Sequence, residues 1–304
     1  MKLIPTTLLA LLMAGTAASL CAKEAERAAP APTDQEELAI AALEGLMAQP
    51  PERALPILKK VLAGAQSTLV KRRALFVLSQ IEGPEANDIL MQTARSTNAE
   101  LRGEAIRSIG IGGDPKSLDA LLEIYRTGDG SLKKEILEAW MIADRKEPVY
   151  QAAINAKTEE EATDAIRTLG EMGATDELRK LGDKPITSNG LLEAFAISGD
   201  LAGLRKIVDG NGDHKVRVDA VRNIGIIDSD AARSALREIY SKTADAEMKD
   251  AALQGMLISQ DDQGVLALYR AAKTTDEKRS LLRTLSMMDS NAALEAIDAA
   301  VEKK

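Results

Sequence analysis

Residues Leu101–Tyr125, LRGEAIRSIGIGGDPKSLDALLEIY, contain the pattern that decides the fold. The first ten residues of this stretch have counterparts at Glu161–Gly170 (EATDAIRTLG), Val216–Gly225 (VRVDAVRNIG) and Glu277–Ser286 (EKRSLLRTLS). A pattern that recurs at a fixed period is typical of repeat proteins, in which each unit buries its apolar surface against its neighbours. We therefore expect an array of similar units.

Each unit is predicted to be a pair of helices. Leu101, Ala105 and Ile109 are spaced four residues apart and form one apolar stripe, with the small Ala105 where two helices approach closely. Gly110–Pro115 is predicted to break this first helix, with glycine as its cap and Pro115 in the first turn of the second helix. The second helix carries its own apolar stripe, formed by Leu118, Leu121, Leu122 and Tyr125.

The whole region 34–304 can be divided into nine such units. A capping box formed by Thr33 and Glu36 is expected to start the first helix. Each unit has a small or aliphatic anchor residue in its first helix, and successive anchors lie 26 to 32 residues apart. The anchors are Ala42, Ala74, Ala105, Ile136, Ala165, Ala194, Ala220, Ala251 and Leu281. With only 2% aromatic residues, the chain is predicted to be all-α, a right-handed α-solenoid of about nine hairpins.

The repeated pattern resembles the HEAT-repeat family. An aliphatic residue, Arg and Ala are followed by Leu/Ile-Gly, by Gly-Asp-Pro and by an aliphatic second helix, as in the short bacterial repeats of the phycobilisome-lyase type. Leu101–Arg126 matches nearly throughout and Val216–Tyr240 matches well, whereas other units match partly or are degenerate. The resemblance implies a solenoid with its first helices on the concave side, and it implies no particular activity.

The N-terminus has the layout of a secretory signal peptide. Residues 1–22 place Lys2 before an apolar run and a stretch of small residues, and residues 23–33 form an Ala- and Pro-rich tether. Cleavage after Ala22 and cleavage after Ala18 both fit. A lipoprotein anchored through Cys21 is the alternative, although Leu20 stands where a small residue is usual. We expect an exported protein, periplasmic, on the cell surface or secreted, with membrane attachment only through a lipid on Cys21.

Two regions depart from the regular pattern. Around 182–213 the units are short and rich in glycine, which indicates either a degenerate repeat with a local kink, the interpretation we favour, or a hinge. The last helix, at 291–304, is alanine-rich with several charged residues. We interpret it as a capping element with a solvated outer side.

Composition and motifs argue against several functions. The formal charge is -8 and there is no basic block, which disfavours nucleic-acid binding. Cys21 is the only cysteine and His214 the only histidine, so metal sites built on these residues are not predicted. The acidic stretch Asp209–Asp213 lacks the glycine and glutamate that a calcium loop needs, and is interpreted as a turn. We expect no cofactor and no catalytic site.

A series of charged residues recurs in the first helices. Acids just before the anchors are Glu104, Glu135, Asp164, Glu193, Asp219 and Asp250, and two residues after the anchors stand Arg107, Arg167, Arg222 and Arg283, with Glu138 breaking the series. Residues three apart share a helix face, so the pairs Glu104–Arg107, Asp164–Arg167 and Asp219–Arg222 are predicted. The predicted protein-binding surface comprises Glu104, Arg107, Glu135, Asp164, Arg167, Asp219, Arg222, Asp250 and Arg283. The alternative is a solvated face with no partner, and the two are compatible.

Other recurring residues are expected to be structural. The bases Lys71, Arg102, Lys133, Arg217 and Lys278 are predicted to bridge neighbouring units. Tyr125, Tyr240 and Tyr269 recur at repeat spacing and are predicted to pack between units, with Trp140 in the core.

The favoured function is an exported scaffolding or protein-interaction module with one or more protein partners. The alternatives are a HEAT-like enzyme similar to bilin lyases, which work in the cytoplasm so that the leader counts against it, and a binder of small molecules or glycans.

Overall fold

The computed structural model describes residues 31–182, 188–288 and 290–302. The predicted leader with Cys21, most of the tether, residues 183–187 of the irregular region and the last two lysines lie outside the described residues. Among the described helices, none combines the length and the apolar character needed to span a bilayer. The chain forms two compact units, residues 1–77 and 78–304.

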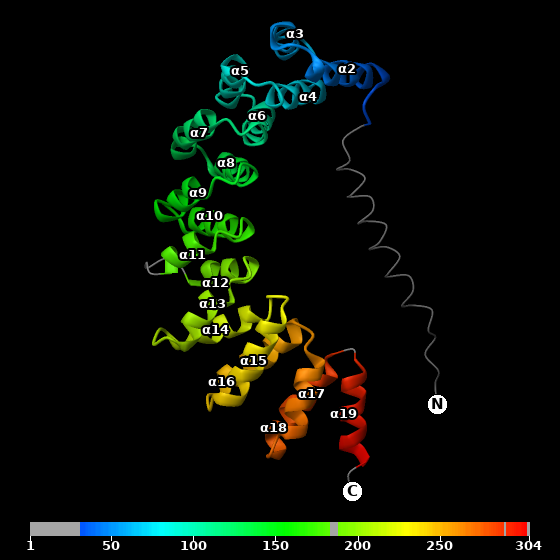
Figure 1. Ribbon diagram of the computed structural model, residues 1–304, viewed down its shortest axis with the longest axis vertical. Helices are drawn as coiled ribbons and strands as arrows, with labels where there is room; N and C mark the ends of the chain where they lie inside the picture. Colours follow the sequence, from blue (N-terminus) through cyan, green and yellow to red (C-terminus); the bar gives the residue numbers. More distant parts are fainter. Residues whose placement is uncertain (1–30, 183–187, 289, 303–304) are drawn as a thin grey trace, which may run out of the picture. The chain divides into compact units, whose positions relative to one another are not determined.

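The described residues form eighteen α-helices and one 3₁₀ helix, η1 (Gly45–Ala48), and no strand, as expected for an all-α solenoid (Figure 1). Along the chain, first and second helices of hairpins alternate. The first helices are α2 (Asp34–Glu44), α4 (Thr68–Ser79), α6 (Ala99–Gly112), α8 (Gly130–Ile142), α10 (Glu159–Glu171), α12 (Ser188–Ile197), α14 (His214–Ile224), α16 (Ala246–Ile258) and α18 (Thr275–Ser286). The second helices are α3 (Pro51–Ala63), α5 (Pro84–Ala94), α7 (Pro115–Thr127), α9 (Lys146–Ile154), α11 (Thr175–Gly182), α13 (Leu201–Asp209), α15 (Asp230–Lys242), α17 (Asp262–Ala271) and α19 (Asn291–Glu302).

The first compact unit, residues 1–77, has the predicted capping box at the start of α2. The Glu36 carboxylate accepts from the Thr33 backbone N–H at 2.8 Å, and the Thr33 hydroxyl accepts from the Glu36 N–H at 3.3 Å. The anchor predicted at Ala42 is wrong, because Ala42 is exposed and its neighbour Leu43 is buried. Successive residues on a helix point about 100° apart, so a stripe shifted by one residue turns Ala42 away from the core.

The turn between α6 and α7 differs from its prediction in one respect. α6 does not end at Gly110 but continues to Gly112, and Gly113 forms the left-handed cap with φ 69°. Asp114 then caps α7 by accepting from the Ser117 N–H at 2.8 Å, and Pro115 is the first helical residue, as predicted. Gly110 therefore has another role, described next.

The first helices of the second unit pack against one another in succession, from α6 on α8 through to α16 on α18. Figure 1 shows α8, α10 and α12 stacked in this way. The anchors Ala105, Ile136, Ala165, Ala220 and Ala251 are all fully buried, as predicted.

Glycines let these helices approach each other closely. A Cβ on Gly110 would lie 2.7 Å from the Ala139 carbonyl oxygen, and a Cβ on Gly225 would lie 2.4 Å from the Cα of Gly255. Gly170 approaches Ala194 in the same way. In each contact the C-terminal part of one first helix meets that of the next, so successive first helices run parallel with their C-terminal ends side by side.

The second helices are linked by ion pairs. Arg237 of α15 donates two hydrogen bonds, at 2.6 and 2.8 Å, to Asp261, which is 4% exposed and also caps α17. Arg179 of α11 and Asp200, the cap of α13, repeat this arrangement with bonds of 2.8 and 2.6 Å. Each buried carboxylate thus joins two neighbouring hairpins.

The two irregular regions are partly as predicted. α11 is short and ends at Gly182, and α12 and α13 have only 10 and 9 residues. The outer side of α19 is exposed to solvent, as predicted, but it carries Leu294, Ile297 and Val301 beside its charged residues. These residues are three and four apart and therefore form one apolar stripe.

Candidate functional site

The exposed stripe of each first helix in the second unit follows one pattern. On α6, Glu104, Arg107 and Ile111 are spaced three and four residues apart, so they lie on the same side of the helix. α14 repeats the pattern with Asp219, Arg222 and Ile226. Because the helices run parallel and pack side by side, equivalent residues form rows that cross the helices.

Three rows make up what we call the first-helix face. The acidic row consists of Glu104, Glu135, Asp164 and Asp219, each three residues before its middle-row residue, together with Asp250, which is four residues before Gln254. The middle row consists of Arg107, Glu138, Arg167, Glu193, Arg222, Gln254 and Arg283. The aliphatic row consists of Ile111, Ile142, Ile197, Ile226, Ile258 and Met287. The nine residues predicted to bind a partner all belong to the first two rows.

One residue of the predicted series changes rows. Glu193 was grouped with the acids because Ala194 was aligned with the other anchors. Ala194 is buried, but Gly170 approaches it as Gly110 approaches Ala139, and each receiving alanine is followed three residues later by an exposed isoleucine. Glu193 lies four residues before its isoleucine, which places it in the middle row.

The ion pairs on this face connect helices more often than predicted. Asp219 and Arg222 pair within α14 as expected, and Arg222 also donates to Gln254 of α16 at 2.7 Å. Arg107 pairs with Glu138 of the next helix at 2.9 Å, and Asp164 pairs with Lys134 of the preceding helix at 3.3 Å.

Glu135 differs electrostatically from the rest of the acidic row. Its carboxylate lies over Gly103 of α6, where a Cβ would be 2.9 Å from one carboxylate oxygen. Burial raises the pKa of Glu135, and Oε2 has no hydrogen-bond partner among the described residues. This acid is packed between α6 and α8, so it belongs to the interface between hairpins as well as to the face.

The predicted bridging role of the bases is confirmed for two of them. Lys133 pairs with Glu161 of the next first helix at 2.7 Å, and Arg217 donates to the Val208 carbonyl at 2.9 Å. The Lys133 ammonium also lies 5.5 Å from the centre of the Tyr125 ring. In the hairpins around α16, Lys249 takes the same place between Tyr240 and Glu277.

Tyr125, Tyr240 and Trp140 pack between hairpins, as predicted. Tyr125 and Tyr240 are buried, and burial, with nearby acids, raises the pKa of each to about 12. Trp140 is fully buried, and its indole N–H donates to the Leu118 carbonyl at 3.1 Å. Tyr269 is only half-buried.

The aliphatic row was missed in the sequence. Its members are 38% exposed at Ile111 and 62% exposed at Met287, with the others between these values. Ile111 and Ile226 directly follow the glycines that approach the next helix, so the repeated Gly-Ile pair was the available signal. In α10 this position is held by Glu171, which interrupts the row.

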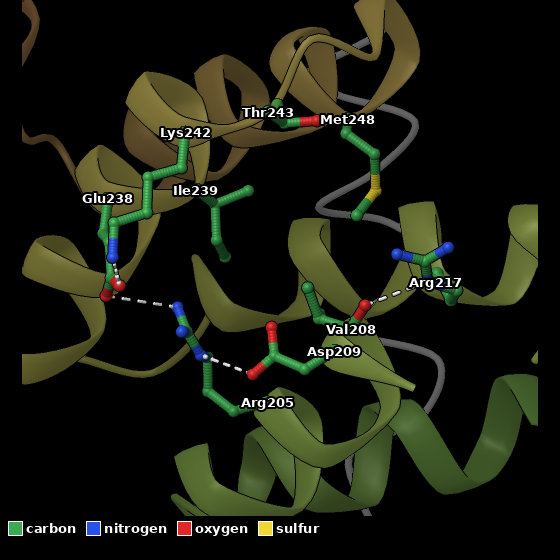
Figure 2. Close-up of a pocket in the computed structure, with 9 residues that line it drawn as sticks. All are labelled: Arg205, Val208, Asp209, Arg217, Glu238, Ile239, Lys242, Thr243 and Met248. Atoms are coloured by element: carbon green, nitrogen blue, oxygen red, sulfur yellow. Dashed lines mark hydrogen bonds and ion pairs between the residues drawn. The ribbon is translucent and has the colours of Figure 1, made fainter. Parts of the chain in front are cut away.

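A pocket of about 310 Å³ lies where successive hairpins meet, between α13, α14, α15 and the start of α16 (Figure 2). Arg205 lies between Asp209, at 3.4 Å, and Glu238, at 3.5 Å, and Lys242 also pairs with Glu238 at 2.7 Å. The charges drawn in Figure 2 are thus largely neutralised by one another. A pocket of the same volume recurs between α7, α8 and α9, lined by Tyr125 and Lys133, so such pockets come with hairpin stacking.

Comparisons with known proteins bear on the fold. Residues 55–141 match the family of HEAT repeats, which confirms the expected family for this stretch, from α3 into α8. No curated protein matches the chain.

Two solved structures are similar at a low level. Human deoxyhypusine hydroxylase in complex with glycerol aligns with a TM-score of 0.32 and 15% identity, covering 74% of this chain and 97% of that one. The complex of CpcE and CpcF of phycocyanin lyase from Nostoc sp. PCC7120 aligns with a TM-score of 0.32 and 20% identity, covering 86% and 96%. Similarity of this degree carries no inference about activity.

Proposed function

We propose that this protein is an interaction module that binds another protein on its first-helix face. The observation that carries the proposal is the aliphatic row. Exposed apolar residues scattered singly are ordinary on protein surfaces, but a row of them flanked by charged residues is typical of interaction sites. Here one such residue stands at the same end of nearly every first helix of the second unit.

The two charged rows support a binding role over a purely structural one. Exposed ion pairs contribute little to stability, about 0–1 kcal/mol each. Charged groups beside an apolar patch instead determine which partner fits, because mismatched charges at an interface cost affinity. The middle row changes sign at each first helix from α6 to α14, so it presents a pattern that a partner can match.

Site-specific photo-crosslinking tests this function in cells that make the protein. A crosslinking amino acid at Arg167 or Arg283, both exposed in the middle row, is expected to capture a defined protein. The same amino acid at Lys116 or Arg126, exposed on the second helix α7, is the control and is expected to capture none. Equal capture from both sets, or capture from α7 alone, would overturn the proposal.

A charge exchange sharpens this test. Replacing Asp219→Arg together with Arg222→Asp keeps an ion pair within α14 but reverses its direction. We expect capture at Arg283 to fall while circular dichroism and thermal unfolding stay as in the wild type. Unchanged capture would show that the charged rows do not contribute to recognition.

We further propose that the protein is exported through residues 1–22. The support is the order of Lys2, apolar residues and small residues in the sequence. Cell fractionation of the full chain against a chain lacking residues 1–22 tests this, and Cys21→Ser tests lipid attachment. Release of the protein from the membrane fraction by Cys21→Ser would favour a lipoprotein over signal-peptide cleavage after Ala22.

A further inference from the structure

The strongest part of the first-helix face is the stretch from α12 to α18. Here the aliphatic row is uninterrupted, with Ile197, Ile226, Ile258 and Met287 on four consecutive first helices, all at least 42% exposed. Before α12 the row is broken at α10 by Glu171. If a partner uses apolar contacts, this stretch offers the largest continuous set.

The spacing of the row selects a class of partner. Packed helices lie about 8–10 Å apart, so successive aliphatic residues of the row are separated by roughly that distance. Two turns of an α-helix advance about 11 Å and return to the same side of the helix. A helix lying across α12, α14, α16 and α18 would therefore present one face to all four. In an extended strand about three residues span the same distance, so that successive contacts would fall on opposite sides.

The charges beside the row indicate what flanks that face. The middle row along this stretch is Glu193, Arg222, Gln254 and Arg283, which is an acid followed by two bases with a neutral residue between them. The acidic row behind it contributes Asp219 and Asp250. A partner complementary to both rows carries lysine or arginine as well as glutamate or aspartate on one flank of its apolar face. A second copy docked through the same face would place its acidic row opposite either the other acidic row or the aliphatic row, and neither arrangement is complementary.

We infer that the stretch α12–α18 binds an amphipathic α-helix of another protein, with aliphatic residues on one face at heptad spacing and charges of both signs beside them. This inference rests on the proposed function and names the kind of partner. It also predicts that the partner helix has about 28 residues, with two turns for each of the four first helices that it crosses.

The test uses the full chain and a fluorescent synthetic helix of about 28 residues, with leucines on one face and alternating lysine and glutamate beside them. Fluorescence anisotropy measures its affinity, and a peptide of the same composition with the leucines spread around the helix is the control. The protein variant is Ile226→Ser with Ile258→Ser, and its control is Leu294→Ser, which removes an even more exposed aliphatic side chain from α19. Circular dichroism confirms that each variant folds.

We expect the amphipathic peptide to bind, the control peptide to bind at least tenfold more weakly, and the double variant to lose at least tenfold in affinity while Leu294→Ser does not. Equal binding of both peptides, an undiminished affinity of the double variant, or a loss with Leu294→Ser alone would overturn the inference. So would a concentration-dependent dimer in sedimentation that the double variant abolishes, because the occupant would then be a second copy. If no peptide binds but photo-crosslinking at Arg283 still captures a protein, the helical partner is wrong and the interaction module stands.

Discussion

The two layers of the second unit are held together by different forces. First helices approach most closely through glycine and alanine, where their backbones come into contact, as at Gly225 and Gly255. Second helices meet through arginine and a buried aspartate, as at Arg237 and Asp261. The close contacts between first helices require residues with little or no side chain, whereas the links between second helices require a pair of opposite charges. The comparison teaches that an array can fix its hairpins tightly on one side and still leave that side's outer surface available, because the contacts use only the inner stripe of each helix.

The largest effect is expected from filling a glycine contact. Gly225→Ala would place a Cβ 2.4 Å from the Gly255 backbone, which cannot move away as a side chain could. We expect a loss of about 2–3 kcal/mol in the free energy of unfolding, the upper part of the usual range of about 1–3 kcal/mol for overpacking. Urea unfolding followed by circular dichroism measures it.

The matched control for this change is Gly130→Ala. Gly130 begins α8, and a Cβ there would meet nothing within 4 Å. Its unfolding free energy should stay within about 0.5 kcal/mol of the wild type, as for most surface changes. If Gly225→Ala is equally mild, the first layer is not held by close backbone approach.

Removing an ion pair between second helices is expected to cost somewhat less stability. Asp261→Ala removes a helix cap, which is worth about 1 kcal/mol, and two charge-assisted hydrogen bonds from Arg237. Arg237 is 41% exposed and water can replace its partner, so we expect a total loss of about 2 kcal/mol. Differential scanning calorimetry with Asp262→Ala as the control separates this loss from a simple change in charge. A variant as stable as the control would contradict the importance of the buried ion pair.

The smallest effect on stability is expected from the pair of His214 and Asp245, which lies at the N-terminal ends of the first helices α14 and α16. His214 of α14 is hydrogen-bonded to Asp245 at 2.6 Å, and this bond, with the charges of Asp245 and Glu247, raises the pKa of His214, while Arg217 opposes the shift. Because the folded state holds the proton more tightly, the bond stabilises the fold at low pH. That contribution is lost as pH rises through the raised pKa of His214.

His214→Ala tests the sign of this effect. The difference in melting temperature between wild type and variant should be larger at pH 5.5 than at pH 8.5. A difference that grows with pH would show that the bond does not depend on the protonated ring. The pair is half-exposed, so we expect a shift smaller than that of Asp261→Ala.

The sequence predicted those features that depend on local spacing. The capping box at Thr33, the cap and proline before α7 and most anchors could be found because their signals lie within one helix and its turn. The core position of Trp140 followed from its place in the repeat. Gly110 shows the limit of such predictions. It lies inside α6 at a close approach to α8 and does not end the helix, and the sequence alone does not distinguish these two roles of a glycine.

The candidate site was predicted in part. Spacing along one helix placed the charged residues on one side, and the Asp219–Arg222 pair formed as expected. The bond from Arg107 to Glu138 could not be foreseen, because it depends on how far one helix is displaced along the next. The aliphatic row was overlooked because an isoleucine beside a buried stripe resembles a core residue until its exposure is known.

The interruption of the aliphatic row at Glu171 affects how a partner is positioned along the first-helix face. A row that repeated without change would have no unique register, since a partner displaced by one hairpin would meet the same side chains again. Glu171 breaks that equivalence, because it places an acid where the other first helices of the row offer isoleucine or methionine. A degenerate repeat thus serves as a position marker, and the irregular hairpins distinguish one end of a periodic surface from the other.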